Sequence, residues 1–274
     1  MHKENKIIIC AALTGAITSK KDNDNLPITE DEIVYAAIDA VSAGAAVIHI
    51  HVRNDNGTPS LSYNAYSRVI KRIRNVCNPV ICVSTSNYGV DVADKERYRL
   101  FNLDSELFTL SFGSINRING SVRNSKAFID QCFEIAAERK KRLEIEIFNT
   151  DMLEQFRQYA NYKGIQSPYV QLIFGSKGGM DSTMKNVVSI LDSLPNDWLV
   201  SCVGVGKAQL PINMMSMFHN ATALRTGLED NVYYSYGVKA ISNAQLVKRL
   251  VEMVSLAGYN IATPSDARSL LAVK

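Results

Sequence analysis

The chain of 274 residues has few cysteines, and none has a spacing that would pair it for metal binding or redox chemistry. The five cysteines form no C-x-x-C pair and stand mostly inside apolar runs, at Cys10, Cys77, Cys82, Cys132 and Cys202. Free thiols in such positions are typical of proteins from a reducing compartment. We therefore expect no disulfide framework.

Long apolar runs and charge of one sign are also missing. No apolar stretch approaches the roughly 18 residues of a membrane span, and the run at 7–13 is too short for a signal peptide. The 30 Lys and Arg residues are interleaved with 27 Asp and Glu residues, which leaves a formal net charge of +3. We expect a cytoplasmic protein whose main partner is neither a nucleic acid nor a membrane.

The short motifs of several common enzyme classes are absent as well. The sequence contains no G-x-x-x-x-G-K-[ST] loop, no G-x-G-x-x-G fingerprint and no G-x-S-x-G elbow. These absences argue against P-loop enzymes, Rossmann dehydrogenases and serine hydrolases of that type.

Eight apolar, β-rich runs do recur along the chain, separated by helix-like stretches. Their near-continuous apolar character is typical of strands buried on both faces of a parallel sheet. They cover residues 7–13, 46–52, 80–85, 107–112, 143–148, 169–174, 198–203 and 223–228.

The clearest of the helix-like stretches begins with Thr29 and Glu32 at capping-box spacing and stops at Gly44. Others cover residues 63–76, 126–139, 152–162, 184–194, 210–219 and 243–256. Strands that alternate with helices over this length predict a (β/α)8 TIM barrel, with an open doubly wound sheet as the alternative. No linker or composition shift divides the chain, so we expect one domain over residues 1–274.

Two histidines stand two residues apart in the second predicted strand. Because side chains alternate along a strand, His49 and His51 face the same side. In a barrel that side is the interior, and active sites lie at the C-terminal ends of the strands, so the pair could share a metal ion. Two structural histidines beside a turn are the alternative. A metal site would also need a carboxylate from elsewhere.

Candidate carboxylates follow the eighth predicted strand. Glu229 and Asp230 come directly after it, and Arg225 precedes them by four and five residues. One carboxylate could bind a metal while the other forms a charge pair that handles protons. A solvated charged loop is the alternative interpretation.

Polar residues collect at other strand ends. Ser84 and Thr109 could hold a substrate carboxylate, although capping a turn is their commoner role. The pair Gly178 and Gly179 could offer backbone N–H groups to an anion, but it lacks phosphate-loop spacing.

The fifth predicted strand carries two inward-facing carboxylates, Glu144 and Glu146. An unpaired carboxylate in a barrel interior is costly. We therefore expect Glu146 to have a cationic partner such as Arg225.

Taken together, these segments closely resemble the β-keto acid cleavage enzymes, named for the 3-keto-5-aminohexanoate cleavage enzyme of lysine fermentation. The combination of H-x-H with the late R-x-G-x-E-D-N is specific, whereas neither motif alone would be. The resemblance runs in order through residues 12–16, 25–29, 43–44, 47–53, 57–60, 84–85, 109–110, 144–146, 178–180, 204–206, 225–231, 242–247 and 262–264.

The resemblance implies a (β/α)8 barrel with one zinc ion per chain and acetyl-CoA as co-substrate. Such an enzyme converts a β-keto acid and acetyl-CoA into acetoacetate and a new acyl-CoA. It implies a homotetramer too. The residues that match the family's functional positions are His49, His51 and Glu229 as zinc ligands, Ser84 and Thr109 as β-keto acid contacts, Arg225 with Asp230 as the proton-transfer pair, and Glu146 as support for the arginine.

The sequence departs from the family pattern at three places. Ile17 replaces a glutamate that could pair with a substrate ammonium, so we expect substrates with neutral, short apolar tails. Ser86-Asn87 replaces a glycine pair, and Lys207 stands where an arginine is common, near expected acyl-tail or CoA contacts.

Two other functions remain as alternatives. One is a different metal-dependent barrel enzyme, such as a class II aldolase or a hydrolase, that does not use CoA. The other is a metal-binding or assembly protein that has lost activity, which the presence of Arg225, Glu229 and Asp230 argues against.

Overall fold

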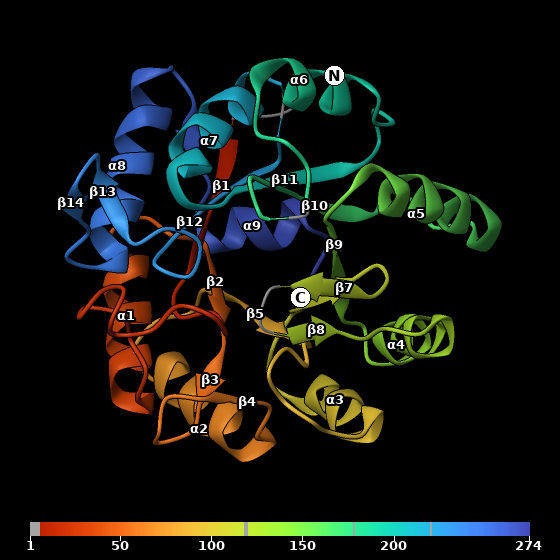
Figure 1. The fold of residues 1–274 in the computed structure, drawn as a ribbon, viewed down its shortest axis with the longest axis horizontal. Helices are drawn as coiled ribbons and strands as arrows, with labels where there is room; N and C mark the ends of the chain where they lie inside the picture. Colours follow the sequence, from red (N-terminus) through yellow and green to blue (C-terminus); the bar gives the residue numbers. More distant parts are fainter. Residues whose placement is uncertain (1–5, 118–119, 178, 220) are drawn as a thin grey trace.

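A computed structural model describes residues 6–117, 120–177, 179–219 and 221–274. Its centre is a ring of eight parallel strands, closed by pairing of the last strand with the first (Figure 1). In ring order these are β1 (Lys6–Ala12), β2 (Val47–Ile50), β5 (Val80–Ser84), β6 (Leu107–Ser111), β9 (Arg142–Ile147), β10 (Tyr169–Phe174), β11 (Leu199–Gly204) and β12 (Ala223–Thr226). The predicted (β/α)8 barrel is confirmed, and the open sheet is excluded.

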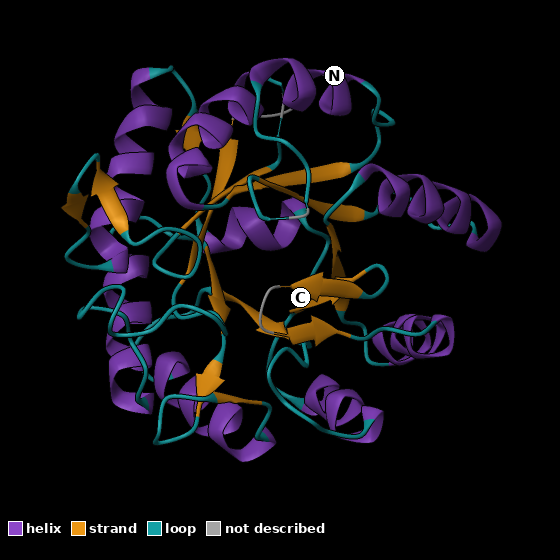
Figure 2. Ribbon diagram, in the orientation of Figure 1, coloured by secondary structure: helices purple, strands orange, loops and turns teal. Residues whose placement is uncertain are grey.

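Helices surround this ring, as Figure 2 shows. The main hydrophobic core lies between them and the outer faces of the strands, and a smaller cluster fills the barrel interior around Ile8, Val47 and Tyr169. Strands buried on both sides in this way must be apolar throughout. The helices are α1 (Glu30–Ser42), α2 (Tyr63–Arg74), α3 (Asp94–Arg99), α4 (Lys126–Glu138), α5 (Thr150–Lys163), α6 (Met184–Asp192), α7 (Gln209–Phe218), α8 (Asn243–Leu256) and α9 (Pro264–Leu270).

Helix α1 begins as its sequence predicts. The Thr29 side chain accepts a hydrogen bond from the Glu32 N–H, and the Glu32 carboxylate accepts one from the Thr29 N–H, which completes a capping box. The helices α3 and α9 were not predicted. Neither were the short strands β3 (Val52–Arg53), β4 (Pro59–Ser60), β7 (Ile115–Arg117), β8 (Gly120–Val122), β13 (Tyr233–Ser235), β14 (Val238–Lys239) and β15 (Asn260–Ile261).

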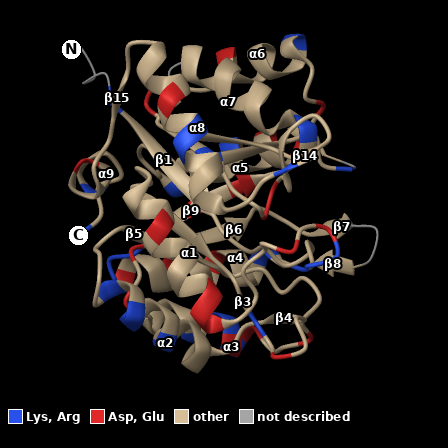
Figure 3. Ribbon diagram, turned by 90° about the vertical axis from the view of Figure 1, so that its left-hand side faces the viewer, with Lys and Arg blue, Asp and Glu red and all other residues tan. Residues whose placement is uncertain are grey.

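The two ends of the barrel differ in what covers them. Figure 3 shows α9 and β15 at one end, and the hairpins β3–β4 and β7–β8 with β14 at the other. The same view shows positive and negative residues intermixed along the chain. Among the described residues, no helix is both long and apolar enough to cross a membrane. The end with the hairpins is the one at which the barrel strands have their C-termini, and the predicted site residues lie there.

Candidate functional site

A cavity of about 220 Å³ opens at the C-terminal ends of the strands. Polar side chains from β5, β6, β9, β10 and β12, and from the residue just beyond β2, meet around it. Its lining includes Ile17, His51, Ser84, Ser86, Tyr88, Ser111, Glu146, Gln171, Arg225, Glu229 and Asp230.

His49, at the end of β2, and His51, just beyond it, both point toward one carboxylate oxygen. Oε1 of Glu229 lies 3.6 Å from Nε2 of His49 and 3.5 Å from Nε2 of His51. The two rings lie edge to face with their centroids 5.0 Å apart. The strand periodicity therefore brings the two imidazoles to the same place.

Two glycines let Glu229 reach this position. Gly227 has a φ of +146°, and a Cβ there would lie 1.9 Å from the Ala12 carbonyl oxygen. Gly15 has a φ of +65°, and its Cβ would lie 2.5 Å from Cγ of Glu229. Side chains at either position would push the segment after β12 away from the end of β1.

The three residues fit a zinc-like ion. One donor atom from each lies within 4.8 Å of the others, and Oε2 of Glu229 is buried without a hydrogen-bond partner. Burial lowers the pKa of His49 to about 4, against the opposing effect of Glu229, so its imidazole is neutral as a ligand must be. Burial would raise the pKa of Glu229, but Arg225 and the two histidines hold it well below its usual range. Two imidazoles and one carboxylate form a common catalytic zinc set.

Arg225 forms a two-pronged ion pair with Asp230. Its Nε lies 2.8 Å from Oδ2 and its Nη2 lies 2.9 Å from Oδ1 of Asp230, while Nη2 is also 2.7 Å from Oε1 of Glu229. Burial raises the pKa of the Asp230 carboxyl, and the guanidinium opposes that shift. The geometry places a buried carboxylate next to the possible metal position.

The expected pairing of Glu146 with Arg225 is wrong. Oε2 of Glu146 instead accepts a hydrogen bond of 2.7 Å from the hydroxyl of Ser111 on the neighbouring strand. Arg225 takes its carboxylate partners from the turn after its own strand, which is closer than β9.

The other predicted contacts are divided. Ser84 lines the cavity, whereas Thr109 does not, and Ser111 two residues later does. Thr109 is buried and lies on the same face of β6 as Ser111, two residues nearer the start of the strand. The N–H of Gly179 donates to the Ser176 carbonyl. It is therefore not free to bind an anion, and the expectation of an anion contact there is wrong. Gly178 lies outside the described residues.

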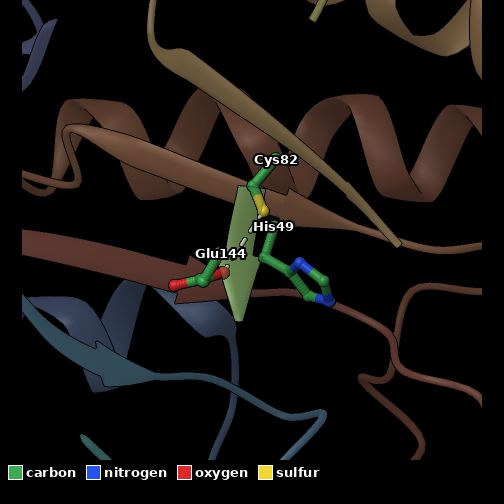
Figure 4. Close-up of side chains that lie close together, drawn as sticks. All are labelled: His49, Cys82 and Glu144. Atoms are coloured by element: carbon green, nitrogen blue, oxygen red, sulfur yellow. Dashed lines mark hydrogen bonds between the residues drawn. The ribbon is translucent and has the colours of Figure 1, made fainter. Parts of the chain in front are cut away.

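A second group of possible ligands lies deeper in the barrel. Figure 4 shows the Cys82 thiol and the Glu144 carboxyl close to the His49 ring. The thiol donates to Oε2 of Glu144 over 3.4 Å. Burial raises the pKa of Glu144 to about 7 and that of Cys82 well above its usual value, which favours the neutral forms. A metal needs the ionised thiol and carboxylate, so this group fits a hydrogen-bonded layer below the site better than a second metal site.

A larger cavity of about 920 Å³ adjoins the first. The two share Ile17, Thr18, Val205 and Asp230 in their walls. Ile17 is 56% exposed and lines both cavities. The rest of the larger cavity includes Lys207, Leu210, Pro211, Tyr233, Tyr236 and Arg249.

Comparison with known proteins identifies the class of protein that this barrel and site define. The model of the beta-keto acid cleavage enzyme family matches residues 6–273, and the chain belongs to that family. It is 32% identical over 270 residues to the 3-keto-5-aminohexanoate cleavage enzyme of Acetoanaerobium sticklandii, covering 98% of each chain. It is 33% identical to the 3-oxoadipate:acetyl-CoA acetyltransferase of Cupriavidus necator, over 96% of this chain and 94% of that enzyme.

Solved structures support the same fold. The apo structure of ObcA superposes with a TM-score of 0.75 at 18% identity, over 91% of this chain and 66% of that longer one. A type I 3-dehydroquinate dehydratase from Clostridium difficile superposes with a TM-score of 0.59 at 11% identity. At such identities the likeness concerns the fold alone.

Proposed function

We propose that the protein is a zinc-dependent β-keto acid cleavage enzyme that uses acetyl-CoA and forms acetoacetate and a new acyl-CoA. The observation that carries this proposal is the convergence of His49, His51 and Glu229 beside the Arg225–Asp230 pair. Names of relatives agree with it, since they include an acetyl-CoA acetyltransferase, a 3-dehydrocarnitine:acetyl-CoA trimethylamine transferase and a 3,5-dioxohexanoate:acetyl-CoA acetone transferase.

In this proposal each polar residue has a defined task. His49, His51 and Glu229 would hold the zinc ion, which supplies Lewis acidity to the ketone and carboxylate oxygens of the substrate. The carboxylate of Asp230 accepts the proton from the carbon between those two groups, and Arg225 holds that carboxylate in place. Ser84 lies in the cavity wall, where its hydroxyl can donate to the acid, whereas Ser111 in the same wall donates its proton to Glu146. Thr109 lies outside this wall, and its carbonyl oxygen accepts a hydrogen bond from the Thr85 hydroxyl.

The two adjoining cavities suit two substrates of different size. The cavity of about 220 Å³ fits a small acid but lies below the range of pockets that hold drug-sized ligands. The neighbouring cavity of about 920 Å³ suits the long CoA carrier, with Leu210 and Pro211 against its apolar part and Lys207 near its phosphates. Their shared wall at Asp230 would place the thioester beside the acid.

Metal analysis and a CoA-dependence assay test this function together. We expect wild type to contain one metal ion per chain, and the His49→Ala and His51→Ala variants to lose it. Turnover of β-keto acids with acetyl-CoA should release acetoacetate. Full metal retention in both variants would contradict the ligand assignment, and turnover without CoA would favour the aldolase or hydrolase alternative.

Substitutions in the larger cavity test where CoA binds. Leu210→Trp and Lys207→Glu should raise KM for acetyl-CoA about tenfold or more and leave KM for the β-keto acid almost unchanged. Lys185 on α6 is exposed and lies outside both cavities, so Lys185→Glu is the matched charge control. Equal KM values in all three variants would argue against this placement.

We also propose that the enzyme is a cytoplasmic homotetramer. The family resemblance supports this assembly, and the tip of the β13–β14 hairpin exposes apolar side chains at Tyr236 and Val238. Light scattering of the purified protein checks it, since a single monomeric species would contradict the proposal.

A further inference from the structure

Arg225 has a third hydrogen-bond partner besides its two carboxylates. Its Nη1 donates to Oε1 of Gln171 over 3.1 Å. The Nε2 of Gln171 in turn donates to Oε1 of Glu144 over 2.7 Å. Gln171 and Glu144 are 0% and 1% exposed, so neither has water to replace these bonds. Glu144 thus lies two hydrogen bonds away from the guanidinium that holds Asp230.

This chain of bonds fixes which way the Gln171 amide points. A guanidinium can only donate hydrogen bonds, and an amide has one accepting oxygen and one donating nitrogen. A half-turn of the amide would place its NH₂ group against Arg225 and its oxygen against the Glu144 carboxyl. The contact with Arg225 would then be lost, because two donors would face each other, and a buried polar group without a partner costs about 1–3 kcal/mol.

We propose that Glu144 is a positioning residue for the Arg225–Asp230 pair and acts through Gln171. This inference rests on the function proposed above for the Arg225–Asp230 pair. Glu146 does not fill this role, because its carboxylate is bonded to Ser111. The proposal also explains why a carboxyl group is kept in the barrel interior, where it is costly unless hydrogen-bonded.

Four variants test whether Glu144 acts on the Arg225–Asp230 pair through Gln171. Glu144→Leu should lower kcat about tenfold while KM for both substrates stays within about twofold. Glu144→Gln keeps an accepting oxygen and should retain at least about a third of kcat. Gln171→Met should behave like Glu144→Leu. The double variant Glu144→Leu/Gln171→Met should be no slower than Gln171→Met alone, because a residue that acts through Gln171 adds nothing once Gln171 is gone.

Ser201 provides a matched control at the same depth. It pairs with Gln171 in the strand register, is 0% exposed, and its hydroxyl has no hydrogen-bond partner. Ser201→Ala also changes a buried polar side chain in the barrel interior, but it leaves the bonds from Glu144 to Arg225 intact. We expect wild-type kcat from this variant.

A second readout does not depend on turnover. In protein labelled with ¹⁵N-arginine, the Arg225 Nε–H resonance can be assigned with the Arg225→Lys variant. It should shift in Glu144→Leu and Gln171→Met but stay in place in Glu144→Gln and Ser201→Ala. An unshifted resonance in Glu144→Leu, or a double variant whose loss is the product of the two single losses, would overturn the proposal.

The two proposals can fail separately. A wild-type protein without acetyl-CoA-dependent activity would contradict the proposed function, while the Arg225 resonance would still decide the positioning role. If Glu144→Leu does not fold, Gln171→Met decides in its place, since a wild-type resonance and kcat there would overturn the inference. The double variant removes both polar partners together, a change that proteins tolerate better than the loss of one.

Discussion

At the scale of single residues, Asp230 gives the sharpest prediction. Asp230→Asn keeps the size of the side chain but removes its ability to accept a proton as a carboxylate. Because general base catalysis contributes about 100-fold to 10,000-fold, we expect kcat to fall within that range. The metal content should stay at one ion per chain, since His49, His51 and Glu229 are unchanged. Steady-state kinetics with metal analysis checks both, and near wild-type turnover would show that Asp230 is not the base.

Ile17 carries the prediction for substrate choice. Its side chain lines both cavities and cannot pair with a cationic tail. Because it is 56% exposed, water moderates the discrimination, and an exposed charge pair is worth up to about 1 kcal/mol. We therefore expect kcat/KM for 3-ketohexanoate to exceed that for 5-amino-3-ketohexanoate by up to about fivefold. Ile17→Glu should reverse this order, and a wild-type preference for the amino substrate would contradict the argument.

At the scale of elements, the N-terminus of α1 predicts a pH dependence. Burial would raise the pKa of Glu32, but Lys20 and the N–H groups of Thr29 and Ile28 outweigh it and lower the pKa from 4.5 to about 2. A pKa lowered by folding stabilises the folded state above the unfolded value and is lost as pH falls through the folded value. Glu32→Gln should therefore be less stable than wild type at pH 7, and the gap should narrow from about pH 4.5 downward. Urea unfolding at pH 7, 5 and 3 measures it, and a constant gap would contradict the assignment.

The elements also show how far sequence patterns reach. The eight barrel strands were predictable because burial on both faces demands continuous apolar runs, which the printed sequence shows directly. Helix α3 was missed because it has six residues and no long apolar stripe. It is held by Arg97, whose buried guanidinium bonds to Thr85, Arg123 and Asn124, far away in sequence.

The candidate site divides in a similar way. The approach of His49 to His51 follows from the two-residue period of a strand, so it could be predicted. The pairing of Arg225 with Asp230 could also be predicted, because the two residues lie five apart at the end of one strand. The partner of Glu146 could not, because it depends on which side chain of a neighbouring strand reaches the carboxylate. The sequence signal for Gln171 is its amide inside the apolar run of β10, and the apolar pattern alone does not say what that amide binds.

At the scale of the whole molecule, the Glu106 carboxylate connects helix α9 to the barrel at the N-terminal ends of the strands. Glu106 is bound by Arg74 over 2.7 Å and by Arg268 of α9 over 2.8 Å, and it accepts the Ile81 N–H. Removing the carboxylate of a buried ion cluster leaves the two arginines without their partner. Glu106→Ala should therefore lower the free energy of unfolding by about 3 kcal/mol. Metal content and KM should not change, because this end lies opposite the site.

Asp104 provides the control for that prediction. Its side chain is 82% exposed and lies 3.6 Å from Nε of the same Arg74. Asp104→Ala should cost less than about 1 kcal/mol. Urea unfolding measures the free energy of unfolding of both variants, and equal decreases would show that burial of Glu106 contributes little.

A single cooperative unfolding transition of the wild-type protein is also expected if residues 1–274 form one domain.

The seam between β12 and β1 has a consequence for the order in which the protein is made. Pairing these strands joins segments that are far apart in the sequence, since Ile8 lies beside Ala223, and it is a slow step because a long loop must close first. During synthesis β1 and β2 emerge well before the turn that carries Glu229. His49 and His51 therefore lack Glu229 as a neighbour until the ring of strands has closed. A nascent chain that lacks Glu229 cannot assemble the three proposed ligands, so metal uptake would follow closure of the ring and then stabilise it by mass action.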